Sequence, residues 1–222
     1  MSRVVICASV LALFSGLAVL ASPGTGSIQG TVVDRHGKPV RDARVIAALL
    51  GAPEPDEKSA RTDANGRFVV PDLPWGKYRV GAEKPEEGYP NMSLTFYSNG
   101  PEPAPVSLNP AKPQANLHLT IKSKAGVLSG TVSDAVSNDP VRATFLLRRA
   151  DQPENLLAVE LPSNYRILVP LDTDIKVEVA APGYKTWYYP GTLEWRESSP
   201  LHLKNTEPLK LDIQLDRIRQ DS

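Results

Sequence analysis

Hydrophobic and polar residues alternate along much of the chain. The alternation is clearest in residues 117–121, 175–179 and 209–215, where every second position is leucine, isoleucine or valine. A period of two is typical of a β-strand with one buried face. Turn-forming pairs such as Asn65-Gly66 separate the runs, and no segment beyond residue 21 shows the 3.6-residue repeat of an amphipathic helix. The pattern predicts about seven short strands in each ~95 residues, which is typical of a β-sandwich.

The sequence contains an internal repeat. Residues 28–34 (IQGTVVD) recur as 128–134 (LSGTVSD), and residues 39–41 (PVR) recur as 140–142. The offset between the copies falls from 100 at residue 28 to 94 near their C-terminal ends, and such length changes are tolerated in loops. The repeat predicts two copies of one module.

The predicted domain organisation follows from the repeat and from the N-terminal segment. Arg3 precedes an apolar run, residues 4–19, and Ala21 offers a small residue at a cleavage site. This is the pattern of a secretory signal peptide, and an uncleaved membrane anchor is the alternative. Cys7, the one cysteine, lies within this segment, so neither module is expected to contain a disulfide. The expected divisions are a signal peptide (1–21), a linker (22–26), a first β-sandwich (27–123), a second β-sandwich (124–217) and a tail (218–222).

Composition narrows the class of protein further. The sequence contains 25 basic residues (lysine and arginine) and 25 acidic residues (aspartate and glutamate). It therefore lacks the excess of positive charge that would predict binding to nucleic acid. Proline supplies 21 of the 222 residues. That is about twice the usual ~5%, and it disfavours long helices. These values argue against a helical bundle, a Rossmann enzyme and a membrane channel, and no membrane span is expected after residue 21.

Several motifs of the first copy resemble a known family. They are residues 30–34 (GTVVD), 37–40 (GKPV), 62–68 (TDANGRF) and 73–80 (LPWGKYRV), in this order. Together they resemble the carboxypeptidase regulatory-like domain. The resemblance implies a transthyretin-like (prealbumin-like, Ig-like) β-sandwich, related to carbohydrate-binding-like folds and without catalytic residues of its own. The predicted fold is therefore all-β, with two tandem sandwiches of this type.

The second copy is interpreted as a divergent member of the same family. It keeps residues 130–134 (GTVSD), but 161–167 (LPSNYRI) stand where the first copy has its Asp-x-x-Gly-x-Phe element. A glycine within a strand favours a bulge or a close approach of two backbones, and this is the interpretation of Gly30 and Gly130.

Two turns in the first copy suggest where its core lies. Asn65-Gly66 supplies residues that adopt positive φ, so this turn is expected to close a hairpin into Phe68. A second tight turn at residues 73–76 is expected to lead into Tyr78. Phe68 and Tyr78 are therefore predicted to be buried across a hairpin.

Residues able to catalyse a reaction or to bind a metal are not grouped along the sequence. His36, His118 and His202 are scattered, and no zinc, nucleophile or phosphate-binding motif is present. Asp63 and Asn65 suit a turn better than a Ca²⁺ site. The prediction is a protein that is not an enzyme, with no catalytic residue, no metal and no cofactor.

Aromatic residues provide the strongest functional signal. Trp187, Tyr189 and Trp195 are close in sequence, and alternation along a strand places Trp187 and Tyr189 on one face. Flat aromatic rings stack on sugars or anchor protein partners. These three residues and Trp75 are the candidate ligand-binding residues. The alternative is that they pack within the fold, and Trp187 in particular is expected to be structural.

The sequence predicts an exported, non-catalytic β-sandwich protein with a binding or structural role in the bacterial cell envelope. Two alternatives remain: a carbohydrate-binding module that uses exposed aromatics, and an accessory subunit or domain of an envelope peptidase or receptor system. The expected location is the periplasm, the outer membrane or the extracellular space. The expected partner is an envelope protein or a polysaccharide, with no nucleic acid, and the oligomeric state is left open.

Overall fold

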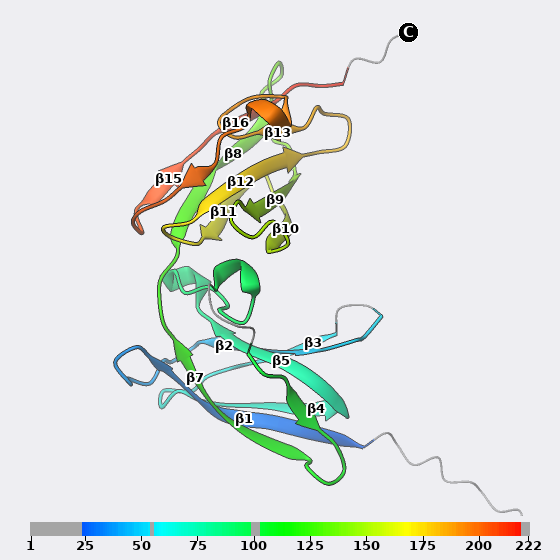
Figure 1. Ribbon diagram of the computed structural model, residues 1–222, viewed down its shortest axis with the longest axis vertical. Coiled ribbons are helices and arrows are strands. Elements are labelled where there is room, and N and C mark those ends of the chain that lie inside the picture. The colour runs from blue at the N-terminus through cyan, green and yellow to red at the C-terminus, as the bar shows by residue number, and fades with distance from the viewer. Residues whose placement is uncertain (1–23, 54–55, 99–102, 219–222) are drawn as a thin grey trace, which may run out of the picture.

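Two β-sheet modules joined by an extended linker make up the described part of the chain (Figure 1). The computed structural model describes residues 24–53, 56–98 and 103–218, so the predicted signal peptide and Cys7 lie outside the described residues. Sixteen strands and three short 3-10 helices are found in these ranges. The prediction of an all-β fold is confirmed, and none of the helices here is long and apolar enough to cross a bilayer.

The first module consists of two sheets. In the three-stranded sheet β1 is central, pairing with β4 in antiparallel and with β7 in parallel orientation. The other sheet has the order β3-β2-β5-β6. The strands are β1 (Thr25–Asp34), β2 (Arg44–Leu49), β3 (Glu57–Arg61), β4 (Arg67–Pro74), β5 (Gly76–Glu83), β6 (Val106–Leu108) and β7 (Gln114–Ile121).

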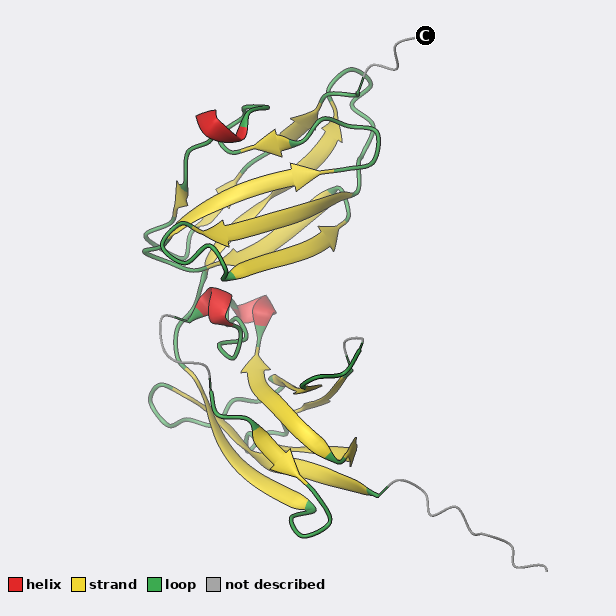
Figure 2. Cartoon of the chain, turned by 45° about the vertical axis from the view of Figure 1, so that its right-hand side comes forward, coloured by secondary structure: helices red, strands yellow, loops and turns green. Residues whose placement is uncertain are grey.

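The second module repeats this arrangement (Figure 2). Here β8 is central, with β11 antiparallel on one side and β15 and β16 parallel on the other. The other sheet has the order β10-β9-β12-β13, and β14 also pairs with β12. The strands are β8 (Gly126–Asp134), β9 (Ala143–Arg149), β10 (Leu156–Leu161), β11 (Asn164–Val169), β12 (Asp174–Ala180), β13 (Trp187–Tyr188), β14 (Leu201–His202), β15 (Pro208–Lys210) and β16 (Ile213–Leu215).

The repeated glycines occupy equivalent places in the two central strands. A Cβ atom added to Gly30 would lie 1.8 Å from the backbone oxygen of Leu117, and one added to Gly130 would lie 2.0 Å from that of Leu211. Both distances are far below van der Waals contact. The glycines thus permit the close backbone approach that the sequence predicted, and it is made to the parallel neighbour in each module.

Phe68 and Tyr78 are both buried, as predicted, with 3% and 1% of their surfaces exposed. The expected hairpins are wrong, because β3 and β4 belong to different sheets and so do β4 and β5. The turns at Asn65-Gly66 and at residues 73–76 therefore carry the chain from one sheet to the other. The two aromatic rings enter one core from opposite sheets, and the Tyr78 hydroxyl donates to the backbone oxygen of Pro74 at 2.7 Å.

The aspartate that ends each repeated motif holds the turn that follows it. Asp34 accepts hydrogen bonds from the backbone N–H groups of His36 and Lys38, at 2.8 and 2.9 Å. These bonds stabilise the charged carboxylate, so the pKa of Asp34 is lowered. The turn after the central strand of the first module is therefore stabilised by the aspartate that ends this strand. An equivalent aspartate ends the central strand of the second module.

Asp134 is more extensively bonded than its counterpart. Its Oδ1 accepts from the backbone N–H groups of Ser137 and Val136, and its Oδ2 accepts from the Tyr184 hydroxyl and from Arg217. The backbone bonds, followed by those from Arg217 and Tyr184, hold the pKa of Asp134 well below its usual 3.8. The buried carboxylate thus fastens the last described residues of the chain to the second module.

Phe68→Ala is expected to lower the free energy of unfolding by roughly 3–5 kcal/mol, because it leaves a cavity between the two sheets. Val69→Ala is the matched control, since the neighbouring Val69 side chain is 53% exposed. It is expected to change stability by no more than ~0.5 kcal/mol. Urea denaturation of both variants measures the difference, and equal losses would contradict the assigned strand orientation.

Asp134→Asn is expected to lower the melting temperature at pH 7. The unfolded chain has an ordinary aspartate pKa of ~3.9, so the lowered folded pKa stabilises the protein fully above that pH. This contribution is lost progressively as the pH falls below about 4. The difference between the melting temperatures of the parent and the variant should therefore become smaller over that range. Asp216→Asn, which removes one charge at an exposed carboxylate, is the control and should melt close to the parent at pH 7. A gap that stayed constant down to pH 2 would disprove this role.

Candidate functional site

Trp187 is a core residue of the second module. It lies opposite Val179 in the short antiparallel pair of β13 and β12. Its side chain is 7% exposed and belongs to the same core cluster as Phe145 and Val177. Tyr189 is half-buried on the same side, with its ring centroid 6.5 Å from that of Trp187. The two residues share one face as predicted, but the Trp187 indole is covered.

Trp195 contacts a different set of side chains. It begins the 3-10 helix η3 (Trp195–Glu197), and its ring packs edge-on against Tyr188 at a centroid distance of 5.5 Å. The Lys176 ammonium lies 5.5 Å from the Trp195 ring centroid. Lys176 also donates to the backbone oxygen of Ser198, at 2.5 Å, and to its hydroxyl, at 3.0 Å. These bonds fix η3 against β12.

The candidate aromatics therefore do not form one platform. Trp187 and Tyr189 face the core, whereas Trp195 joins Tyr188, the residue that points the other way from β13. The physical reason is the loop after β13, which brings η3 back to the Tyr188 side. Of the candidate aromatics, Trp195 alone is largely accessible, with 44% of its surface exposed.

Trp75 is half-buried in the turn between β4 and β5. A Cβ atom added to Gly24 would lie 2.7 Å from the Trp75 indole, and one added to Gly26 would lie 3.0 Å from it. The start of β1 thus passes directly over this ring, and the ring packs against the first core. Trp75 covers an edge of the core and leaves only part of its surface free.

The three histidines have separate and ordinary surroundings. The Nδ1 atom of His118 is 2.8 Å from the Thr31 hydroxyl, and the Nδ1 atom of His202 is 2.7 Å from an Asp174 carboxylate oxygen. Asp63 accepts from backbone N–H groups within its own turn. No group of three or more His, Cys, Asp or Glu side chains able to hold a metal occurs among residues 24–53, 56–98 and 103–218.

The contact between the modules is made by residues that the sequence analysis did not single out. The connection from β5 to β6 contains η1 (Pro85–Glu87) and η2 (Thr95–Tyr97) and reaches the second module. Phe96 is 1% exposed and belongs to the core cluster of the second module, although it comes from the first. The signal was two adjacent aromatics in an unusually long connection.

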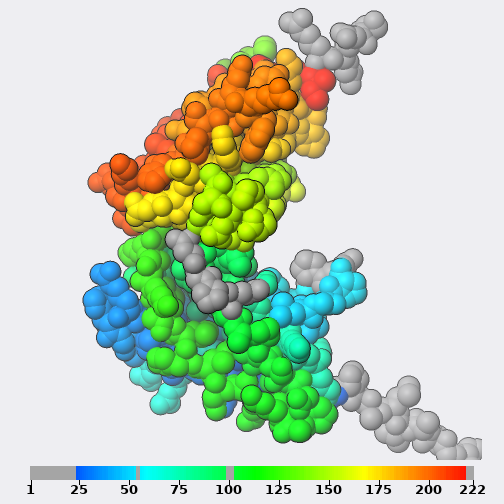
Figure 3. Space-filling model, in the orientation of Figure 1, coloured from blue at the N-terminus to red at the C-terminus, as the bar shows by residue number. Residues whose placement is uncertain are grey.

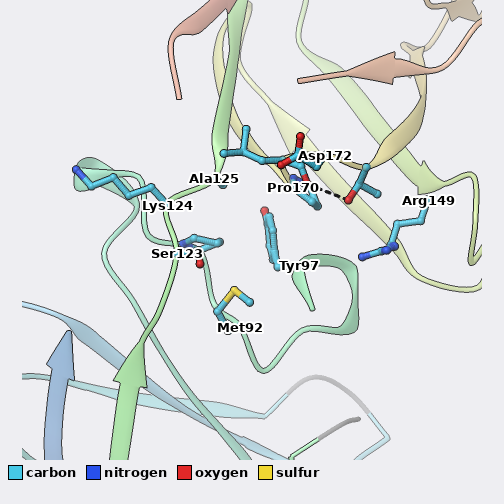
Figure 4. A pocket seen from close by; sticks show the side chains of 11 residues that line it. Met92, Tyr97, Ser123, Lys124, Ala125, Arg149, Pro170 and Asp172 are labelled. Atoms are coloured by element: carbon cyan, nitrogen blue, oxygen red, sulfur yellow. Dashed lines mark hydrogen bonds between the residues drawn. The ribbon is translucent and has the colours of Figure 1, made fainter. Parts of the chain in front are cut away.

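Tyr97 extends this contact and borders a cavity of about 340 Å³ between the modules (Figure 4). Its hydroxyl donates to the backbone oxygen of Leu168 at 3.2 Å, and burial raises its pKa. Arg149, which is 2% exposed and forms two hydrogen bonds to Asp151, lies across the cavity. Because Asp151 neutralises Arg149, the cavity has no unpaired buried charge at this wall.

The sequence also contains an N-glycosylation motif, Asn91-Met92-Ser93. In the structure these residues stabilise a turn instead. Asn91 and Ser93 are both 6% exposed, and the Asn91 side-chain oxygen accepts from the backbone N–H and the hydroxyl of Ser93. Asn91 therefore shapes the connection that carries Phe96, and its amide is not accessible to a glycosylating enzyme.

Each module is thus a β-sandwich whose central strand carries the same motif, and the first module resembles the carboxypeptidase regulatory-like domain. The model of that family matches residues 27–108. The resemblance seen in the motifs is confirmed there, and the second module repeats the sheet topology. No curated protein matches the sequence.

Several solved structures resemble the chain. A streptococcal ancillary pilin is 13% identical, with a TM-score of 0.33, over 88% of this chain and 63% of its own. The shaft pilin SpaA from Lactobacillus rhamnosus GG is 13% identical, with a TM-score of 0.32, over 90% of this chain and all of its own. A DUF3823 family protein from Bacteroides ovatus is 11% identical, with a TM-score of 0.34, over 81% of this chain and 99% of its own. This chain spans less than two thirds of the ancillary pilin chain, and similarity at this level carries no argument about function.

Trp187→Ala is expected to destabilise the protein by roughly 3–5 kcal/mol, because the buried indole would leave a cavity. Trp195→Ala should cost less than ~1 kcal/mol, since its ring is partly exposed and its cation–π contact is weak. Thermal melting of the two variants, measured side by side, checks this order. A Trp187→Ala variant as stable as the parent would show that its indole is not part of the core.

Proposed function

We propose that this protein is an exported, non-catalytic component of a bacterial cell envelope. Its two β-sandwich modules, residues 27–123 and 124–217, would act as one stiff spacer that offers its loops to partners. Export is inferred from the apolar N-terminal segment, residues 1–21. The periplasm, the outer membrane and the cell exterior all suit a folded domain without cysteine.

The observation that carries the proposal is the burial of Phe96 in the core of the other module. Modules joined only by a linker move relative to one another unless a hydrophobic interface holds them. Burying a phenylalanine side chain contributes about 1.5–3 kcal/mol, enough to favour the docked arrangement. A spacer needs this property, whereas an enzyme needs a reactive cluster in a cleft.

Hydrogen bonds between the modules reinforce the aromatic contact. Arg166 of the second module donates to the backbone oxygen of Pro85 at 2.9 Å. The backbone N–H of Ala125 donates to the backbone oxygen of Gly88 at 2.9 Å. Together with the Tyr97 hydroxyl bond, these contacts restrict rotation as well as separation of the modules.

Two spin labels test the stiffness of the chain. Lys112→Cys and Lys185→Cys, in a Cys7→Ser background, place one label on an exposed site of each module. A narrow distance distribution is expected for the parent, and Phe96→Ala should broaden it because the interface loses its buried ring. Val69→Ala, with the same labels, is the control and should leave the distribution narrow. A broad distribution in the parent would refute the spacer.

Binding of a carbohydrate is the second candidate. It is supported by the exposed Trp195 ring, next to which Lys176 and Tyr188 are held. A single accessible ring supports only weak stacking. A role as an accessory domain of a peptidase or receptor system would use the same stiff modules, with the partner bound at their loops.

A further inference from the structure

A second cleft lies beside the linker and has a basic lining. Its volume is about 430 Å³, and it is bordered by the loop after β1, by the linker and by the loop between β14 and β15. Arg35 and His36 come from the first of these segments, Lys122 and Lys124 from the second, and Thr206 from the third. Figure 3 shows a notch at this place, on the left between the blue and the orange-red atoms. Both modules contribute to the cleft, so it exists only while they are docked.

The cations of this cleft lack acidic partners. Among the ion pairs of the described residues, none includes Arg35, Lys122 or Lys124. Asp34 is the acidic residue in the lining, and its Oδ1 is already bonded to two backbone N–H groups. In a chain with 25 basic and 25 acidic residues, this is a local excess of positive charge.

Neighbouring side chains orient these charges. The Lys124 ammonium lies 5.3 Å from the centroid of the Tyr89 ring, and Figure 4 shows it pointing away from Tyr97 and the other cavity. Lys122 lies two residues earlier in the linker and lines the same cleft. The Arg35 Nε donates to the His36 ring at 3.0 Å, which holds the guanidinium beside the cleft.

We infer that the cleft binds an anionic ligand that carries at least two oxyanion groups. Each of these groups is a carboxylate, a sulfate or a phosphate. The three cations supply the charge, and the hydroxyls of Ser123 and Thr206 add hydrogen-bond donors at its edge. The volume lies within the ~300–1,000 Å³ of small-ligand sites. A free polyanion or an acidic unit of a polysaccharide would present the same groups. The inference goes beyond the proposed spacer, which needs no ligand.

Calorimetric titration of the full chain with inorganic tripolyphosphate and with polygalacturonate tests the inference, with dextran as the neutral probe. Binding of at least one anion is expected at low salt, weakening as salt screens the charges. The Arg35→Gln, Lys122→Gln, Lys124→Gln triple variant should bind roughly tenfold more weakly, or worse. The matched control, Arg67→Gln, Lys112→Gln, Lys185→Gln, removes the same charge from exposed positions elsewhere and should bind like the parent.

Each outcome has a defined meaning. Tripolyphosphate binding lost in the cleft variant supports a site for small polyanions, and polygalacturonate binding alone supports an acidic polysaccharide. A cleft variant with Lys122→Arg and Lys124→Arg retains the charges and should retain binding, which separates charge loss from damage to the fold. The inference is overturned if neither anion binds, if dextran binds equally well, or if both triple variants weaken binding to the same extent.

Discussion

The burial of Phe96 in the core of the other module determines the shape of the whole junction. An aromatic side chain placed there cannot return to water without exposing both itself and the hydrophobic cavity that receives it. With Phe96 in place, Tyr97 reaches the backbone of β11 and the linker runs alongside. The two clefts at the junction, one bordered by Arg149 and one by Lys122 and Lys124, follow from this single docking event.

The strands, the repeat and the family could all be predicted, because each is encoded in short stretches of sequence. Period-two alternation identified the strands, and Gly30 and Gly130 marked two places where backbones approach closely. The assignment of strands to sheets was harder. A turn such as Asn65-Gly66 specifies local backbone geometry, and the same geometry serves a hairpin or a crossing between sheets. The expected hairpin into Phe68 was wrong for that reason.

The aromatic site shows the same limit. Alternation correctly placed Trp187 and Tyr189 together, because they are two residues apart on one segment. The position of Trp195 depends on a loop and on the bonds from Lys176 to Ser198, which connect residues 22 positions apart. The contact made by Phe96 is longer in range still. Contacts of this kind follow from packing in three dimensions, and one sequence contains no periodic signal for them.

The parallel strand pairs also determine how the protein would carry a mechanical load. If the chain is pulled from its ends, force enters the first module at the start of β1 and leaves it at the end of β7, and these strands are parallel neighbours over residues 27–34 and 114–121. The force is then directed along the strands, so their hydrogen bonds must break together in shear and cannot open one at a time. In the second module β8 and β16 have the same relation. In both modules, tension along the chain therefore loads the strand pairs in shear, the direction in which they resist separation most strongly.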